Sequence, residues 1–369
     1  MAEEEKIQMG GQAVIEGVMM RSPLGYSIAV RKKDKSIKVK CVPYKALAKR
    51  VKILGLPFIR GFIMLFEMLI IGLKGLDFSV NEWEGDYGKE AGDHPDSKEK
   101  AIEDANAESP ENKKNDDPKE ERQLSIFAMA GMMLFSIGLG LALFVVVPNF
   151  LTHFLGKILP LGASSEGGLE ETRSPFFYNL ISGFFRALIL VTYIWVISLS
   201  KNIHRVFEYH GAEHKAVFAF EDKKSLTVEN VRPYITRHPR CGTTFIGVVI
   251  IISIFAFALI VKNLGILYPP FLEMSFLKRK AIIIFLHILF MPVIAGISYE
   301  IIKFGSRHLD NPLTRILTYP GILSQYLTTK EPDDEQLEVS IASLKAALSI
   351  NQDLKEPKIA ILHPNETPQ

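Results

Sequence analysis

Four long apolar stretches limit what this chain can fold into. They run over residues 124–151, 177–200, 243–262 and 281–302. Each is long enough to cross a hydrocarbon layer of about 30 Å, which takes about 20 apolar residues in a helix. Unpaired backbone groups are costly in lipid, so such stretches form helices. We therefore predict a mainly α-helical, polytopic membrane bundle with about four transmembrane helices.

The composition agrees with a membrane protein and argues against several other classes. Of the 369 residues, 48% are hydrophobic and 10% are aromatic, and 24 are Phe. The formal net charge is only +2, so no overall excess of positive charge predicts nucleic-acid binding. Cys41 and Cys241 are the only two cysteines, which excludes a disulfide framework and fits loops in a reducing compartment.

Lysine and arginine are distributed unevenly among the segments that connect the apolar stretches. The segment 201–242 holds eight of them. Because positive residues are retained on the cytoplasmic side of a membrane, both termini and the 201–242 loop are predicted to be cytoplasmic. Lys278, Arg279 and Lys280 fall on the opposite side and count against this orientation.

The segments before the first apolar stretch differ from it in composition. Two runs rich in β-branched residues, 26–31 and 36–42, predict a small β-hairpin in the N-terminal cytoplasmic region 1–53. Residues 54–80 are apolar but interrupted by charges, which favours an amphipathic or re-entrant helix. Residues 81–123 are dominated by Asp, Glu, Lys, Asn and Pro, a composition typical of a disordered linker.

The C-terminal cytoplasmic segment 304–369 follows the membrane domain 124–303. Pro320 and Gly321 predict a turn. Acidic and capping residues around Asp333 predict the start of a cytoplasmic helix that ends near position 350. Near the other end of the chain, the glycines of MGGQAVIEGVMMRSP predict a shaped loop with tight turns. No Gly-Lys-Ser or Gly-Lys-Thr follows, so this is not a phosphate-binding loop.

Residues 210–214 read His-Gly-Ala-Glu-His, the H-x-x-E-H pattern of inverted zinc peptidases. A helix turns once in about 3.6 residues, so His210 and His214 lie one turn apart on one face and can bind one cation. Glu213 would then lie beside the metal, where a general base is needed. A short pattern in a basic connecting segment also arises by chance, so metal binding here is a hypothesis.

Further ligands are expected from two other segments. Cys241, in HPRCGTTF, comes directly before an apolar stretch, and zinc accepts nitrogen and sulfur ligands tetrahedrally. Glu300 lies near the end of the fourth stretch, and an acid at that depth suggests function. Both have an alternative: a free cysteine is often just buried, and Glu300 can pair with Arg186 or Lys303. Weaker candidates, of which the first two can also pair with each other, are Glu16, Arg21, His238 and Arg186.

Three motifs, in this order along the chain, resemble one bacterial family. They are GGQAVIEGVMMRSP, the His-Gly-Ala-Glu-His box with the following HPRCGTTF, and PGILSQYLTTKEPDDEQLEV. The chain is similar to the YqhQ-like family of membrane proteins of unknown function, described as predicted metal-dependent enzymes. The resemblance implies no substrate. It implies a site made of polar residues of these motifs: His210, Glu213, His214 and Cys241, with Glu16, Arg21, His238 and Glu300 as weaker members.

These features together predict a protein of the bacterial inner membrane whose cytoplasmic face binds a divalent metal, with zinc preferred. The predicted activity is hydrolysis of a peptide, or of another amide or ester at the membrane surface, with Glu213 as the general base. One alternative is a non-catalytic scaffold in which a structural metal or hydrogen bonds hold the histidines. Another is a small transporter or channel, suggested by Arg186, His287 and Glu300 at membrane depth. We expect the lipid bilayer as a partner, allow for a homo-oligomer, and expect no nucleic acid.

Overall fold

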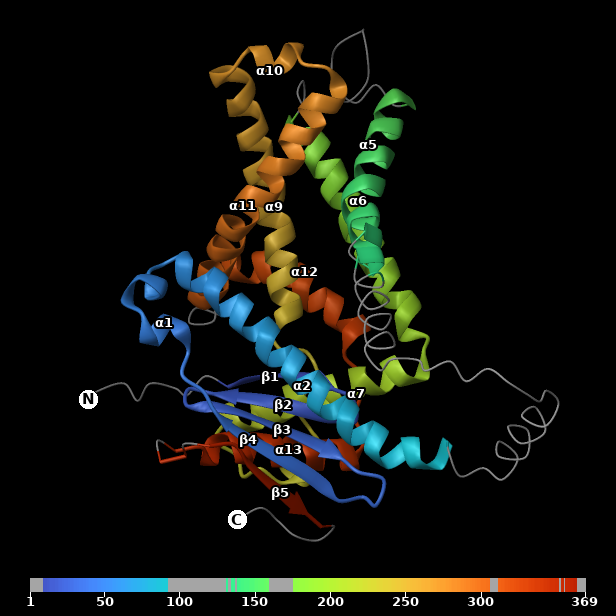
Figure 1. Ribbon diagram of the computed structural model, residues 1–369, viewed down its shortest axis with the longest axis vertical. Coiled ribbons are helices and arrows are strands. Elements are labelled where there is room, and N and C mark those ends of the chain that lie inside the picture. Colours follow the sequence, from blue (N-terminus) through green and yellow to red (C-terminus); the bar gives the residue numbers. More distant parts are fainter. Residues whose placement is uncertain are drawn as a thin grey trace, which may run out of the picture.

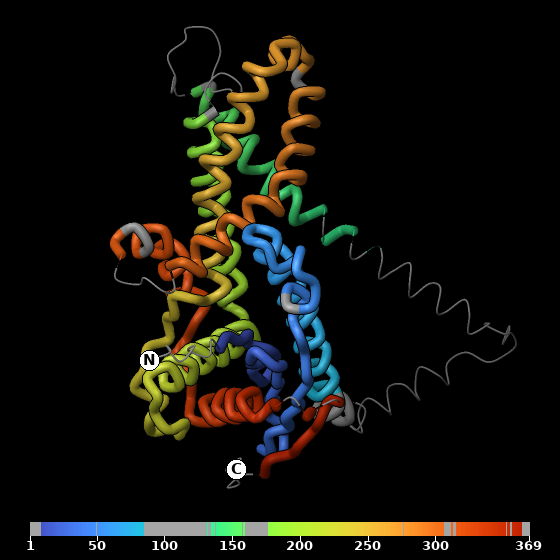
Figure 2. The backbone as a smooth tube through the Cα atoms, turned by 90° about the vertical axis from the view of Figure 1, so that its left-hand side faces the viewer, coloured from blue at the N-terminus to red at the C-terminus, as the bar shows by residue number. Residues whose placement is uncertain are grey.

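The computed structural model of this chain describes residues 9–91, 131, 134–136, 138–158, 175–305, 311–351, 353–354 and 356–363. The fold is mainly helical with one antiparallel sheet, and Figure 1 shows two parts along its long axis. Long apolar helices form one end, and the sheet with its covering helices forms the other (Figures 1 and 2). Most of the predicted linker 81–123 lies outside the described residues.

Within the described residues, the apolar end contains four helices that are long and apolar enough to cross a membrane. The first, Leu134–Gly156, includes a π-helical turn (Ala142–Val146) and most of α5 (Val147–Ile158); the others are α6 (Pro175–Ser198), α9 (Gly242–Leu267) and α11 (Phe276–Gly305). The last three predicted stretches are thus confirmed as helices, and so is the described part of the first. The short helix α10 (Pro270–Glu273) joins α9 to α11 at the end far from the sheet (Figure 1).

The other end is built on a five-stranded antiparallel sheet whose strands follow the chain order. The strands are β1 (Gly10–Val14), β2 (Gly17–Ser22), β3 (Gly25–Arg31), β4 (Ile37–Pro43) and β5 (Lys358–Leu362). β3 and β4 confirm the predicted hairpin. The predicted glycine loop before them is wrong, because its residues form a second hairpin, β1–β2, whose two-residue turn holds Glu16 at a φ of 51°. β5 brings the C-terminal segment back to β4.

Helices cover both faces of this sheet and give a three-layer arrangement (Figures 1 and 2). On one face lie α7 (Lys201–Glu221) and α13 (Asp334–Ser349), and on the other lies α2 (Ile59–Ala91). Neighbouring side chains of a strand point to opposite faces. Met20 therefore packs in the core beneath α7 and α13, whereas Met19 packs in the core beneath α2.

The helix α2 connects the two parts of the molecule. It packs on α11 near its start and lies on the sheet further along (Figure 1). Where the sequence predicts an amphipathic or re-entrant helix over 54–80, the chain first forms α1 (Leu47–Arg50) and a short 3-10 turn (Lys52–Gly55). α2 then continues to Ala91, so the first part of the predicted disordered linker is helical.

The connection 201–242, predicted as a loop, is largely helical. It begins with α7 and also contains the short helix α8 (Val228–Val231). The predicted C-terminal helix is confirmed as α13. It begins as expected, because Asp333 and Gln336 form a capping box at its N-terminus.

One further helix, α12 (Pro312–Thr328), packs across α9. The predicted turn at Pro320 and Gly321 is wrong, because both residues lie inside this helix. Gly321 has no side chain, which lets α12 approach the backbone of Thr244 in α9. The end of α12 is thereby held close to the first turn of α9.

Candidate metal centre

The His-Gly-Ala-Glu-His box lies in the second half of α7. His210 and His214 are one helical turn apart, and their ring centroids are separated by 4.5 Å. Ala212 and Ala216 lie on another face of the helix, where they pack in the core against the sheet. The helical period that buries the alanines turns both imidazoles toward the connection 236–241.

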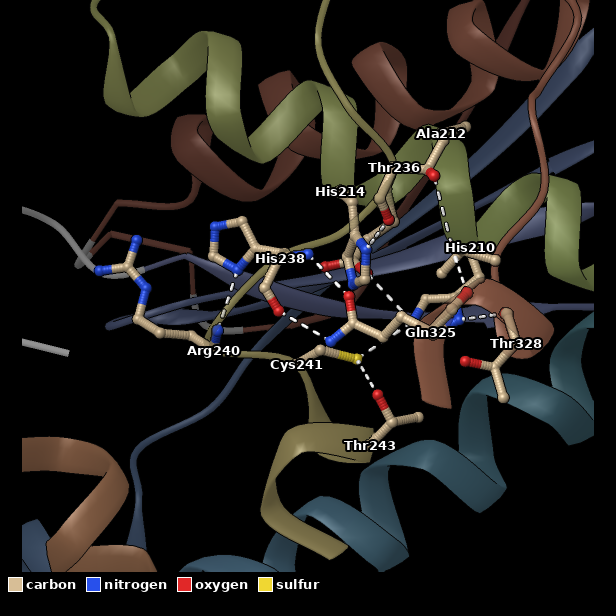
Figure 3. A network of polar contacts seen from close by, with 12 residues as sticks. His210, Ala212, His214, Thr236, His238, Arg240, Cys241, Thr243, Gln325 and Thr328 are labelled. Atoms are coloured by element: carbon tan, nitrogen blue, oxygen red, sulfur yellow. Dashed lines mark hydrogen bonds and ion pairs between the residues drawn. The ribbon is translucent and has the colours of Figure 1, made fainter. Parts of the chain in front are cut away.

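Cys241 brings a sulfur atom to the two histidines (Figure 3). Its Sγ lies 3.2 Å from His210 Nε2, and the Thr243 hydroxyl donates to it at 3.3 Å. The ligand atoms of His210, His214 and Cys241 all lie within 4.8 Å of one another. Cys241 is also the N-cap of α9, where the positive end of the helix dipole favours negative charge. The structure thus brings the box and the cysteine together.

Backbone carbonyls fix the orientation of both imidazole rings. His210 Nδ1 lies 2.8 Å from the Thr328 carbonyl oxygen, and His214 Nδ1 lies 2.5 Å from that of Thr236. A carbonyl can only accept, so each Nδ1 carries the proton and each Nε2 keeps a lone pair directed at the cluster. The Nε2 of His214 is buried and makes no hydrogen bond to any described residue. Two oriented lone pairs beside a sulfur atom are what a metal ion needs.

Glu213 lies against both imidazoles. Its Oε2 is 3.5 Å from His214 Nε2 and 4.0 Å from His210 Nε2. Burial raises the pKa of this carboxyl, while the nearby histidines and a hydrogen bond from the Gly11 backbone of β1 act in the opposite direction. Burial also lowers the pKa of His214, which keeps its imidazole neutral and able to bind a metal. The cluster therefore combines a neutral ligand with a carboxyl suited to accept a proton.

His238 packs beside the cluster but directs its ring nitrogens elsewhere (Figure 3). Its Nδ1 accepts a hydrogen bond from the Arg240 backbone N–H, and its Nε2 lies 3.7 Å from Glu221 Oε2. Its ring centroid is 5.6 Å from that of His214. Gln325 of α12 holds this segment, because its side chain accepts from the His238 N–H at 2.7 Å and donates to the His238 carbonyl at 2.9 Å. His238 therefore forms a wall of the site.

Glu300 is not part of the cluster, contrary to its expected role as a ligand. Its carboxylate is bound by Arg60 of α2, with distances of 2.6 Å from Nε to Oε1 and 2.5 Å from Nη2 to Oε2. The alternative expectation of a salt bridge is right in kind, although the partner is neither of the two residues considered. Arg186 lies in α6, an element that supplies none of the three converging ligand atoms.

Glu16 and Arg21 lie in the first hairpin and bind different helices instead of each other. Glu16, in the β1–β2 turn, accepts from Arg205 of α7 at 2.5 and 2.8 Å. Arg21 points toward α2, where its guanidinium contacts the sulfur of Met68 and lies 3.8 Å from Glu67. Neither residue supplies a ligand atom to the cluster. Both fasten a helix to the sheet.

No sequence pattern predicts the segment 328–331, which crosses α7 beside the box and which we call the strap. Thr328 supplies the carbonyl that orients the first histidine, and the Lys330 N–H donates to the Phe207 carbonyl at 2.9 Å. A Cβ at Gly211 would overlap the Lys330 carbonyl oxygen, so the glycine of the box makes room for the strap. The only hint in the sequence is that TTKEP belongs to the third family-like motif.

The donor set of the cluster fits a zinc ion. Zinc in proteins is bound tetrahedrally by cysteine sulfur and histidine nitrogen, and catalytic sites combine three protein ligands with one open position. His210, His214 and Cys241 offer two nitrogens and one sulfur. The buried, unbonded Nε2 of His214 has a role only if something binds it. His214 is buried whereas the other two ligands are half-buried, so the open side lies toward His210 and Cys241.

Comparison with known proteins supports the resemblance noted in the three motifs. Residues 56–350 match the family described as "Protein of unknown function (DUF1385)". The chain is 32% identical over 342 residues to the "Uncharacterized protein YqhQ" of Bacillus subtilis (strain 168), an alignment that covers 92% of each chain. No solved structure matches this chain. The protein therefore belongs to the DUF1385 family of proteins of unknown function.

Proposed function

We propose that this protein is a zinc-dependent hydrolase whose site lies where the apolar helices meet the sheet. The observation that supports this most is the convergence of ligand atoms from His210, His214 and Cys241 beside the buried carboxyl of Glu213. Three ligands leave one position for a reactant, and the carboxyl lies where a general base is needed. A purely structural zinc site has four protein ligands and needs no base.

The residues of the chain divide the work of such a hydrolysis. The strap and the Thr236 carbonyl hold both imidazoles with their Nε2 atoms toward the same point. Glu213 takes a proton from the attacking water and passes it to the leaving group, and burial raises its pKa toward the range in which both transfers are efficient. A bound zinc ion supplies Lewis acidity, which polarises a carbonyl and acidifies water. The burial of His214 and Glu213 keeps bulk water from these groups, which strengthens their electrostatic interactions.

The apolar helices support a site at a membrane surface. We propose that they cross the bacterial inner membrane with the sheet, α7 and α13 on the cytoplasmic side, as the eight Lys and Arg of 201–242 favour. Cys241 caps the start of α9, and Thr328 ends α12, so the ligands lie next to the ends of helices at the border of the apolar part. This position favours a peptide, or another amide or ester, that is held at the membrane surface.

A structural metal site in a non-catalytic scaffold is the second candidate. It is favoured by the position of the cluster at a crossing of three segments: α7, the connection 236–241 and the strap. A metal bound there would fasten these segments without any reaction, with Glu213 as the fourth ligand. A transporter has less support, because Glu300, which suggested it, is bound by Arg60.

Cobalt substitution combined with a kinetic variant separates the two candidates. Sulfur ligation of Co²⁺ gives a charge-transfer band in the near ultraviolet, which Cys241→Ser should abolish. Glu213→Gln should keep this band but slow the zinc-dependent hydrolysis of p-nitrophenyl esters or labelled casein by about 10²–10⁴-fold. His204→Ala is the matched control, because His204 lies on an exposed turn of the same helix, and it should change neither property.

The outcomes point in different directions. Loss of the bound metal in Glu213→Gln would identify this carboxylate as a ligand and favour the structural site. The same holds if the zinc-loaded wild type hydrolyses neither substrate. Retention of both metal and full activity in Glu213→Gln would show that the proposed mechanism is wrong.

A further inference from the structure

The face of α2 that points away from the sheet carries a row of large apolar side chains. This row, which we call the outer stripe, consists of Phe62, Phe66, Leu69, Ile70 and Leu73, which are 40% to 59% exposed. Spacings of three and four residues put them on one side of the helix. Single exposed apolar residues are normal, but a continuous row of them marks an interaction surface.

The opposite face of α2 is already occupied. Ile71 and Phe78 are buried in the core beneath the sheet. Glu67 is also buried, and its carboxylate accepts from the Tyr44 hydroxyl at 2.6 Å and from the Leu47 N–H at 2.5 Å. These contacts fix the rotation of α2 about its axis, so the outer stripe cannot turn inward.

The segment that leads into α2 extends the apolar surface. Val51, Ile53, Leu56 and Phe58 are 45% to 67% exposed. Phe58 also adopts a φ of 68°, a left-handed conformation that is unfavourable for an aromatic residue. Such a conformation persists only where neighbouring contacts hold it, which indicates that this corner is fixed by its surroundings.

Glu300 of α11 provides those contacts. Its carboxylate accepts from Arg60 at 2.5 and 2.6 Å and also from the backbone of Phe58. The Phe58 side chain remains 53% exposed. The apolar surface of α2 therefore begins at a corner that is fastened to a helix long and apolar enough to cross a membrane.

The charges around this surface are of one sign. Lys45, Arg50, Lys52 and Lys74 are all exposed. Glu67 is the one acidic residue between positions 45 and 76, and it is buried on the inner face. An apolar helix face bordered by cations is typical of a helix that lies on a membrane with anionic lipids. A second copy packed on the same surface would bring like charges together.

We propose that the outer stripe and residues 51–58 dock onto the leaflet of an anionic lipid bilayer. The apolar side chains enter the boundary between headgroups and acyl chains, and the four cations face lipid phosphates. This inference rests on the membrane insertion proposed above. It means that α2 holds the sheet, and with it the metal centre, at a fixed height on the membrane.

Quenching of tryptophan by brominated lipid tests this contact directly. The full-length protein with Phe66→Trp and Trp83→Phe is reconstituted into phosphatidylcholine vesicles with phosphatidylglycerol, with or without bromine on the acyl chains. Trp195, which is 53% exposed on α6, remains in every sample and reports whether that helix is inserted. The matched control is Asp77→Trp in the same background, an exposed position of α2 outside the stripe. We expect a blue shift for Phe66→Trp, and a loss of emission in brominated vesicles that Asp77→Trp does not show.

Each alternative has its own result. Equal quenching of the two variants, with Trp195 quenched, would overturn the docking of the stripe while leaving membrane insertion intact. If Trp195 is not quenched either, insertion itself fails. A blue-shifted but unquenched Phe66→Trp that cross-links into a dimer would assign the stripe to a second copy. Quenching that is unchanged without phosphatidylglycerol, or by Lys52→Glu with Lys74→Glu, would reject the role of anionic lipid.

Discussion

Replacement of Gly211 by alanine should loosen the metal centre, although the same change strengthens most helices. Alanine is normally favoured over glycine inside a helix by about 0.5–1 kcal/mol. In α7, however, the added Cβ would overlap the Lys330 carbonyl of the strap and lie 3.1 Å from the Thr236 methyl group. The strap cannot simply move away, because Glu331 is paired with the buried Lys215 on its far side. Both crowded neighbours belong to the segments that orient the histidines.

The magnitude follows from the contacts that the strap would lose. A shift of the strap weakens the 2.9 Å hydrogen bond between Lys330 and Phe207 and the 2.8 Å contact between Thr328 and His210. Each hydrogen bond is worth about 1 kcal/mol, and overpacking costs about 1–3 kcal/mol. With the helix gain subtracted, Gly211→Ala should lower the free energy of unfolding by about 1–3 kcal/mol. Because ligand orientation suffers, zinc affinity should fall by about 10–100-fold.

Denaturant unfolding in detergent measures the first quantity, and competition with a chromophoric chelator measures the second. Gly140→Ala is the matched control. Gly140 is also helical, but no described atom lies within 4 Å of its added Cβ. This control should be neutral or stabilising and should leave zinc affinity unchanged. A Gly211→Ala protein that is more stable than wild type and binds zinc equally well would refute the tight contact between strap and box.

Three other changes around the centre have specific expected results. Gln325→Leu removes the partner of both the N–H and the carbonyl of His238, and denaturant titration should show a loss of about 2–4 kcal/mol in the free energy of unfolding; an unchanged value would contradict these hydrogen bonds. Cys241→Ser should let a chelator remove zinc that the wild type and Cys41→Ser both retain, and equal retention by all three proteins would exclude the sulfur ligand. Burial lowers the pKa of His238 from its ordinary 6.5, so the unfolded chain binds the proton first and the metal-free protein should lose stability as the pH falls below 6.5. His238→Gln should reduce that loss in unfolding measured against pH, and an identical pH profile would count against this origin.

Local properties of the sequence predict the apolar helices and the geometry of the box. A long apolar run has one stable form in lipid, so α6, α9 and α11 follow from composition alone. The one-turn spacing of His210 and His214 also needs only helical geometry. The first hairpin is harder to predict, because the glycines of β1 and β2 resemble a loop. What makes these segments strands is the pairing with β3 and the burial of Met19 and Met20 on opposite faces.

The rest of the centre depends on contacts between segments far apart in the chain. Thr328 orients His210 from 118 positions away. Glu300 was expected near the metal because an acid at a helix end gives no sign of its partner, and its partner Arg60 is 240 positions away. The role of Gly211 is equally hidden, because the segment that crowds it is not adjacent in sequence. One sequence without its contacts cannot supply these pairings.

Metal content, measured by elemental analysis of detergent-purified protein kept away from chelators, is the most direct test of the proposed centre. Wild-type protein should contain about one zinc ion per chain, because the folded site supplies oriented ligands. The double variant His210→Ala with His214→Ala should contain none, whereas His204→Ala should keep the wild-type content. A wild-type protein without a bound divalent metal, or a double variant that retains it, would contradict the assignment of these residues as ligands.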